Sequence, residues 1–205
     1  MKAFLRRHQS LIVNVFLVIA LGRHSAVKAW EAWQADTFDF VEVAFAVHNA
    51  VLLTMILARR QHQSIDRRVF PQIVALVAFF SGLAFIKHPT EEWARLSQGI
   101  TIAAWILGTV SLLNLGRSFG ILIAVRQVKT GGLYRLVRHP MYLTDILWRV
   151  GYLAGNLCWR NAAIFVASTA CYVYRAMLEE RFLLQLDEYQ AYARKVRYRF
   201  VPGIF

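Results

Sequence analysis

The chain has 205 residues, of which 58% are hydrophobic and 18% are charged, and its 24 Lys and Arg against 12 Asp and Glu give a net charge of +12. Soluble domains carry charged residues at about a quarter of their positions, so this composition excludes an ordinary water-soluble domain. The mean hydropathy is positive, and we therefore expect a protein of the lipid bilayer.

Six apolar stretches are candidates for membrane-spanning helices, which need roughly 17 to 25 residues. The first is short and resembles the apolar core of a signal peptide, but no small-residue cleavage site follows it, so we expect a retained helix. The sequence thus predicts an all-α, multi-pass transmembrane bundle of about six spans in one integral membrane domain, residues 1–205. In chain order the stretches are Gln9–Leu21, Phe38–Ala58, Phe70–Ile86, Ser97–Leu115, Met141–Leu157 and Ala162–Leu178.

The basic residues are distributed unevenly along these stretches. With the N-terminus inside, 17 of the 24 Lys and Arg fall in inner segments and five in outer segments, while Arg149 and Arg175 fall within spans. Positive charge concentrates on the cytoplasmic side of membrane proteins. We therefore interpret the excess as a topology signal with some attraction to anionic lipid headgroups, not as a nucleic-acid-binding surface. Both termini are expected in the cytoplasm.

A polar segment, TGGLYRLVRHPMY (residues 130–142), separates the fourth and fifth stretches. Two adjacent glycines indicate a turn, and Pro140 suits the first position of a helix, where its missing N–H costs nothing. His139 and Tyr142 are three residues apart, so both can face one pocket. The alternative is a tight loop with arginines at the lipid headgroups and with Tyr134 and Tyr142 as interfacial aromatics.

A second polar cluster lies at the end of the last span. Arg175 is about one turn inside the apolar stretch, where a charge usually marks function or a dedicated partner. Glu179 lies four residues further on the same face, so an intrahelical ion pair is the alternative. Glu180 and Arg181 are expected to be solvated. Beyond them, the pattern predicts a basic amphipathic helix on the membrane surface, formed by Tyr189, Tyr192, Val196 and Tyr198 with Arg194, Lys195, Arg197 and Arg199.

Three motifs, in this order and spacing, resemble the isoprenylcysteine carboxyl methyltransferase family and its bacterial relatives, within a wider group that includes the membrane phospholipid methyltransferases. They are LGRSFG, VKTGGLYRLVRHPMY and EERFLLQLDEYQAYARKVRYRFVPGIF. The resemblance covers about Leu115 to Phe205, so we read residues 1–115 as N-terminal spans and 116–205 as the methyltransferase region with an interfacial C-terminal tail. It favours a bacterial inner membrane over the endoplasmic reticulum. The chain departs from the family at Thr144, where the family has glycine, and near Ala124, where a polar residue is usual.

The resemblance implies S-adenosylmethionine as the cofactor, bound on the cytoplasmic side by the C-terminal half without a Rossmann domain. The chain indeed has no G-x-G-x-x-G between a strand and a helix. Arg175 matches the arginine that lies beside the methyl acceptor in the family, and is the expected catalytic residue. The cofactor site, carried over by position, comprises Val128, Lys129, Tyr134, His139, Pro140, Met141, Tyr142 and Glu179.

The expected reaction is methyl transfer to a carboxylate, or a similar nucleophile, of a lipophilic acceptor such as an isoprenylcysteine-like molecule. A carboxylate is nucleophilic at neutral pH, and an arginine can hold it with two parallel hydrogen bonds. An amine would first have to lose a proton, to Glu179 or His139. A phospholipid-amine N-methyltransferase is therefore the alternative, and a non-catalytic membrane binding protein with the same fold is a second. The expected partners are the acceptor and membrane lipids, not nucleic acid.

The remaining polar residues of the spans have simpler interpretations. Asp145 and Arg149 are four apart and predict a structural salt bridge or, alternatively, the lining of a path for the acceptor's headgroup. His48 is expected to be a core histidine. Cys158 and Cys171 lack metal-type spacing, so neither a metal site nor a disulfide is expected.

Overall fold

The computed structural model describes residues 15, 18–28, 30–31, 34, 39–60 and 62–204. Residues 18–28 are helical, but most of the predicted first span, Gln9–Leu21, lies outside the described residues.

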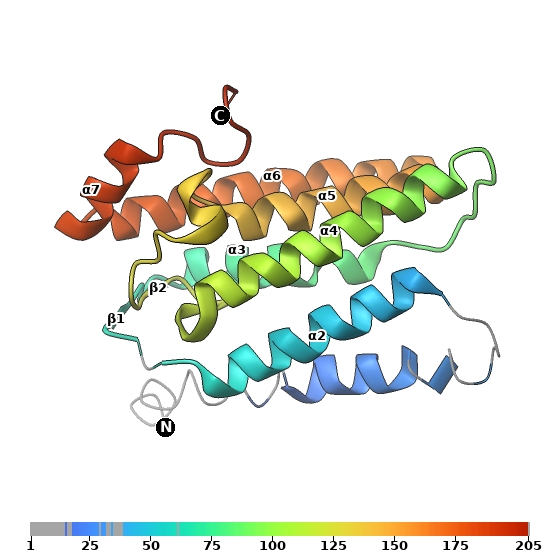
Figure 1. Ribbon diagram of the computed structural model, residues 1–205, viewed down its shortest axis with the longest axis horizontal. Coiled ribbons are helices and arrows are strands. Elements are labelled where there is room, and N and C mark those ends of the chain that lie inside the picture. The colour runs from blue at the N-terminus through green and yellow to red at the C-terminus, as the bar shows by residue number, and fades with distance from the viewer. Residues whose placement is uncertain are drawn as a thin grey trace.

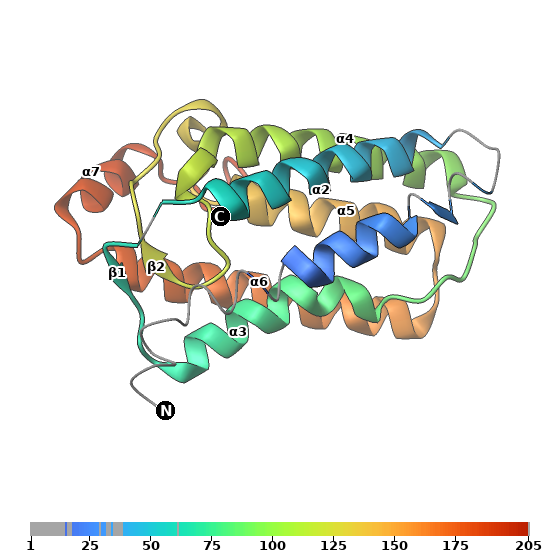
Figure 2. The same cartoon turned by 90° about the horizontal axis from the view of Figure 1, so that it is seen from below.

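The described chain is mostly helical, and the five later apolar stretches each correspond to a helix within a few residues. Helices α2 to α6 run side by side along the long axis, whereas β1, β2 and α7 gather at one end (Figures 1 and 2). The strands pair antiparallel with Ser64 opposite Val125. The elements are α2 (Phe40–Ala58), β1 (Ser64–Ile65), α3 (Val69–Phe80), η1 (Ser81–Ala84), α4 (Ala94–Leu115), η2 (Gly116–Ser118), β2 (Ala124–Val125), η3 (Gly132–Arg135), α5 (Pro140–Gly155), α6 (Trp159–Leu183) and α7 (Asp187–Lys195).

Two helical segments, Phe40–Ala58 and Ala94–Ser118, are long and apolar enough to cross a membrane. Large apolar side chains also point outward from several helices, among them Leu57, Val69 and Val166, each more than 60% exposed. Soluble proteins rarely expose apolar side chains on such a scale, whereas a lipid-facing surface consists of them. The helical fold and the membrane character are thus confirmed, and the count of six spans stays a prediction.

The predicted turn before α5 forms as expected. Gly132 has a φ of 58°, which favours glycine, and a Cβ built on it would lie 1.9 Å from Asn114 Oδ1. That amide oxygen instead accepts the Leu133 N–H at 2.8 Å. Pro140 then opens α5 in its first turn, as predicted.

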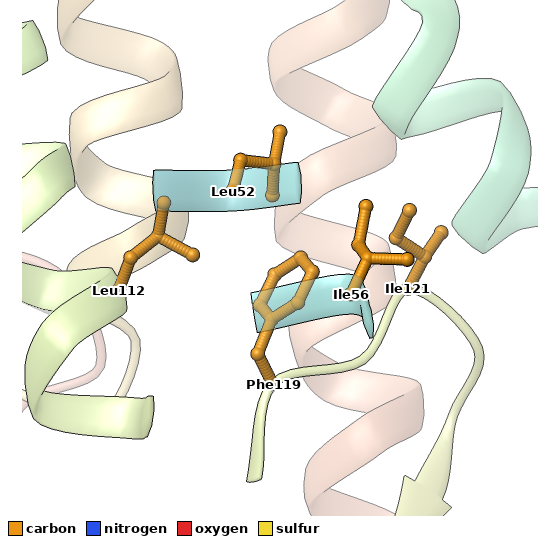
Figure 3. Close-up of a cluster of buried hydrophobic side chains, with 5 residues drawn as sticks. All are labelled: Leu52, Ile56, Leu112, Phe119 and Ile121. Atoms are coloured by element: carbon orange, nitrogen blue, oxygen red, sulfur yellow. The ribbon is translucent and has the colours of Figure 1, made fainter. Parts of the chain in front are cut away.

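An apolar cluster ties α2 and α4 to the loop that follows η2. Its five side chains are each at most 6% exposed, and their close packing stabilises the contact between these segments. Figure 3 shows these side chains converging from the three segments. They are Leu52, Ile56, Leu112, Phe119 and Ile121.

The same loop is also held by a side-chain amide. Gln72, on α3, accepts the Ile123 N–H at 3.0 Å and donates to the Ile123 carbonyl at 3.1 Å. Its amide nitrogen also donates to the Asp66 carbonyl at 2.7 Å. The loop therefore has a fixed course although it has no regular secondary structure.

Glycines allow close contact between α4 and α5. A Cβ built on Gly151 would lie 2.4 Å from Thr101 Oγ1 and 3.0 Å from the Thr101 backbone nitrogen. A rotamer change cannot relieve the backbone contact, so the two helices would have to separate. Gly99, on α4, has no heavy atom within 4 Å of the equivalent position.

We expect Gly151→Ala to destabilise the protein by about 1–3 kcal/mol, the usual range for overpacking. Gly99→Ala is the matched control, and it should be neutral or stabilise by up to about 1 kcal/mol, since alanine is the better helix former. Thermal unfolding of both variants in one detergent measures the difference. Equal midpoints for the two variants would contradict the close packing of α4 on α5.

Candidate functional site

A cavity of about 990 Å³ runs between the helices. Its lining extends from Tyr192, in α7, to Tyr152, near the C-terminal end of α5. Ligand pockets commonly have volumes of about 300–1,000 Å³. Pro140 is buried but does not line the cavity. The other expected site residues all do: Val128, Lys129, Tyr134, His139, Met141, Tyr142, Arg175 and Glu179.

Helices α5 and α6 contribute a polar wall to this cavity. The Tyr142 hydroxyl donates a hydrogen bond to the Glu179 carboxylate. The rings of His139 and Tyr142 stack with centroids 5.2 Å apart and planes 6° apart, so the two side chains lie together as their spacing predicts. The wall thus presents a carboxylate whose position is fixed by a phenol.

Arg175 is 4% exposed and lies with its guanidinium 4.9 Å from the centre of the Tyr142 ring. It donates to two backbone carbonyls, from Nη1 to Ala75 at 3.1 Å and from Nη2 to Ile121 at 2.6 Å. The suggested ion pair with Glu179 is wrong, because no ion pair within 4 Å joins the two side chains. The guanidinium instead reaches sideways, to α3 and to the loop after η2.

Arg149 is 1% exposed and forms the predicted ion pair with Asp145, with Nη1 3.8 Å from Oδ1. Nη1 also donates to the Asp145 carbonyl at 2.7 Å, and Nη2 to Ser81 Oγ at 3.1 Å. The guanidinium lies between the rings of Trp148 and Tyr172, at 4.5 and 4.8 Å. Asp145 and Arg149 also both line the cavity, so a ligand in the cavity can contact this pair.

Glu180 is 5% exposed, so the expectation that it is solvated is wrong. Its carboxylate accepts hydrogen bonds from Arg138 Nε at 2.6 Å and from Arg199 Nε at 2.8 Å, and lies 3.2 Å from His139 Nε2. The reason is the course of the chain after α7, which returns over this side of α6. We call Glu180 with Arg138, His139 and Arg199 the Glu180 clamp.

Backbone hydrogen bonds hold the returning tail against the start of α5. The Arg138 N–H donates to the Tyr198 carbonyl and the His139 N–H to the Arg199 carbonyl, both at 2.9 Å. Arg138 Nη1 also donates to the Val196 carbonyl at 2.9 Å. The residues that precede α5 are therefore positioned by the tail.

The apolar face of α7 packs on the protein. Tyr189, Tyr192 and Val196 form a buried cluster with Tyr134, and the Tyr192 hydroxyl donates to the Tyr134 carbonyl at 2.7 Å. For these three residues, the expectation that they face the membrane is therefore wrong. The Tyr189 hydroxyl is buried without a hydrogen-bond partner among the described residues, and Tyr189 lines the cavity.

The two departures from the family pattern have different consequences. Thr144 is buried outside the cavity lining, with its hydroxyl donating to the Met141 carbonyl at 2.9 Å and its side chain near Gly108 of α4. It therefore changes helix packing and not the cavity wall. Ala124, in β2, does line the cavity.

Sequence reasoning missed Arg126 as a residue of this site and Glu180 as the buried carboxylate that holds His139 next to it. Glu180 neighbours Glu179, and two adjacent carboxylates next to a family motif were a signal. Arg126 was counted only as an inner positive charge, yet it is 9% exposed and lines the cavity. Its position two residues before Val128, an expected cofactor-site residue, was the feature of the sequence that could have indicated its role.

The Glu180 clamp controls the protonation of its carboxyl group. Burial alone would raise the pKa of Glu180, but hydrogen bonds from His139, Arg138 and Arg199 outweigh burial and lower the pKa from 4.5 to about 2. Because the folded pKa is depressed, the clamp contributes stability above about pH 4.5 and loses it as the pH falls toward 2.

Comparison with known proteins agrees with the motifs. The family described as phospholipid methyltransferase matches residues 99–189. Protein-S-isoprenylcysteine O-methyltransferase B of Arabidopsis thaliana is 29% identical over 167 residues, which cover 75% of this chain and 81% of that protein. Methanethiol S-methyltransferase 1 of Bradyrhizobium diazoefficiens is 31% identical over 112 residues, 47% of this chain and 38% of that protein. The steroid 5-alpha-reductase DET2 of Solanum lycopersicum is 27% identical over 149 residues, 64% of this chain and 57% of that protein.

The family match and the methyltransferase relatives agree on the reaction class, and the helices fit a protein of the bilayer. The chain is a membrane-associated methyltransferase. These similarities support the family predicted from the motifs, the isoprenylcysteine carboxyl methyltransferase family within the wider group of membrane phospholipid methyltransferases.

Glu180→Gln should lower stability at neutral pH by about 3–5 kcal/mol, the cost of removing one partner from a buried ion pair. It should also remove most of the pH dependence between pH 4.5 and 2 that the depressed pKa of Glu180 produces. Thermal unfolding of wild type and variant from pH 6 to 3 tests both effects, with Glu188→Gln, at an exposed position of α7, as the control. Parallel pH profiles for wild type and Glu180→Gln would contradict the clamp.

Proposed function

We propose that the protein transfers the methyl group of S-adenosylmethionine to a carboxylate of a lipophilic acceptor. One observation carries the proposal: the cavity brings the Glu179 carboxylate, bonded to Tyr142, and the Arg175 guanidinium, over the ring of Tyr142, to a single wall. A cationic donor and an anionic acceptor can therefore be held side by side.

The residues present fit S-adenosylmethionine. Glu179 supplies a negative charge for a cationic ligand. The Tyr189 and Ser118 hydroxyls, which both line the cavity, are buried without a hydrogen-bond partner in the described part of the chain. Buried polar groups normally have a partner, and a polar ligand would provide one. When bound, the cofactor supplies a methyl group already activated on a sulfonium.

Arg175 would hold the acceptor's carboxylate. A guanidinium has five N–H donors, and here Nη1 and Nη2 each give one to a backbone carbonyl. Each terminal nitrogen therefore retains a second N–H. Because α3 and the loop after η2 fix its position, Arg175 is preorganised before an acceptor arrives, which is how a charged group contributes most to a reaction. The remaining task of the protein is to align the two reactants and exclude water.

The lipophilic part of the acceptor would lie further along the cavity. This part of the lining is rich in large apolar side chains, including Leu52, Phe79, Leu83, Phe85 and Trp105. The names of the isoprenylcysteine O-methyltransferase relatives suggest a lipidated acceptor of this kind. We further propose that the end of the bundle near α7 faces the cytoplasm, where the polar cofactor is available, with both termini on that side.

A second candidate is methylation of an amine or a thiol. The observation that favours it is the engagement of both terminal nitrogens of Arg175 with backbone carbonyls, which leaves fewer donors for an acceptor. The matching family is described as phospholipid methyltransferase, and one relative is named a thiol methyltransferase. An amine acceptor, however, would meet repulsion from the guanidinium.

Calorimetry of purified protein with S-adenosylmethionine tests the cofactor. Glu179→Gln and His139→Ala should each weaken binding roughly tenfold to a hundredfold, the scale for losing a hydrogen bond to a charged group. Glu92→Gln, at an exposed position, is the matched control for the loss of a carboxylate and should bind normally. Unchanged affinity in both site variants would leave the cofactor site without support.

Arg175→Lys tests the acceptor. Lysine keeps the charge and loses the planar fork, so turnover of N-acetyl-S-farnesylcysteine should fall by about a hundredfold, while the affinity for S-adenosylmethionine changes much less. Arg175→Ala removes the cation and relieves its repulsion of an ammonium group, so turnover of an amine acceptor such as phosphatidylethanolamine should persist or rise in that variant. Arg181→Lys, at an exposed position of the same helix, controls for the substitution itself. Full activity of Arg175→Lys on the carboxylate acceptor would reject the carboxylate mechanism.

A further inference from the structure

Arg126 has a buried guanidinium in the cavity wall and few partners. It follows β2 directly, is 9% exposed, and makes one long hydrogen bond within the described residues, from Nε to the Arg60 carbonyl at 3.4 Å. Its terminal nitrogens have no acceptor, and its guanidinium no carboxylate within 4 Å, in the part of the chain that the structure describes. A buried charge without a partner is strongly unfavourable, so this position is suited to a ligand that brings one.

The fold makes specific room for this guanidinium. On one side, the pairing of Val125 with Ser64 fixes the backbone just before Arg126. On the other side, the guanidinium covers Gly120, where an added Cβ would lie 2.2 Å from Nη1 and 2.6 Å from Cζ. Gly120 has no positive φ that would require glycine, and an alanine at this position would displace the guanidinium. The guanidinium therefore has a defined place in the wall.

The charges around Arg126 favour an anion. The pKa of Arg59 is lowered to about 10, mainly by burial and also by the positive charge of Arg126. The pKa of His62 is lowered as well, mainly by burial and then by the charges of Arg126 and Arg59. Among the described residues, the carboxylate whose negative charge raises the pKa of Arg126 is that of Glu179. Glu179 already accepts a hydrogen bond from Tyr142. The cavity thus has a positive place at Arg126 and a negative one at Glu179.

We propose that Arg126 is an anion-binding residue of the cavity, which holds a ligand's carboxylate through its two terminal nitrogens. This inference rests on the proposed function, because that function supplies two ligands with a carboxylate: S-adenosylmethionine at its amino-acid end, and the acceptor. The cofactor is the source we expect, since Arg126 lies two residues before Val128 of the expected cofactor site and Arg175 is available to the acceptor. With Glu179 near the ammonium group, Arg126 would then complete the recognition of a zwitterionic amino-acid group.

Calorimetry with a matched pair of ligands tests this on the full chain in detergent. S-adenosylmethionine and its decarboxylated form carry the same sulfonium and the same primary ammonium group, and differ in the carboxylate. Wild type should bind S-adenosylmethionine roughly tenfold to a hundredfold more tightly than the decarboxylated form. Arg126→Gln should reduce binding of S-adenosylmethionine to the level of the decarboxylated form, whose affinity should not change.

Two further variants separate this role from a general effect on folding. Gly120→Ala keeps the arginine but displaces its guanidinium, so it should cause the same selective loss. Arg60→Gln removes an exposed neighbouring arginine and keeps the carbonyl that Arg126 contacts, so it should bind both ligands as wild type does.

The remaining outcomes identify the source or overturn the inference. If Arg126→Gln leaves the cofactor affinities unchanged but raises the KM for N-acetyl-S-farnesylcysteine at least tenfold, the carboxylate is that of the acceptor. If neither quantity changes in Arg126→Gln and Gly120→Ala, the inference is wrong while the proposed function stands. If wild type binds neither S-adenosylmethionine nor its decarboxylated form, the proposed function itself fails.

Discussion

The end of the bundle that contains the site depends on the hydrogen bonds to the Glu180 carboxylate. A charge buried among helices is tolerated only when hydrogen bonds satisfy it, and here the donors come from the residues before α5 and from the returning tail. To reach Glu180, the tail that carries Arg199 folds back over α6, and α7, which precedes this tail, packs Tyr192 on Tyr134. The hydrogen bonds that neutralise this one buried acid therefore join the start of α5, the end of α6 and the returning tail.

The polar side chains of α5 and α6 recur at helical spacing, so they line the cavity and not the outer surface of the bundle. On α5, Tyr142, Asp145 and Arg149 recur at intervals of three and four residues, and on α6 Arg175 and Glu179 are four apart, so that each set lies on one face. Both faces line the same cavity. A chain with few charged residues can therefore concentrate them along one wall while the outer surface stays compatible with lipid.

Local features of the sequence predicted the helices from hydropathy, the turn from the conformational freedom of Gly132, and the start of α5 from Pro140, which lacks an N–H. Each of these properties acts within a few residues. They could not predict that Glu180 is buried, since one of the side chains that bind it, Arg199, lies on a tail that returns from beyond α7. The partners of Arg175 were equally out of reach. They are carbonyls 100 and 54 residues earlier in the chain, and a backbone acceptor leaves no mark in the sequence. The place of Arg126 could not be predicted for the same reason, because its hydrogen-bond acceptor is the backbone carbonyl of Arg60, 66 residues earlier.

The amide pairing between Gln72 and Ile123 has a consequence for how the molecule fluctuates. An irregular loop normally exchanges its amide hydrogens with solvent quickly, because nothing has to open first. Here the Ile123 N–H is bonded to a buried side chain of α3, while the Asp66 N–H is bonded to the Ile123 carbonyl. Exchange at the Ile123 amide requires the bond to Gln72 to break, and exchange at the Asp66 amide requires the chain after β1 to separate from the loop, so protection of the two amides reports how firmly the loop is held.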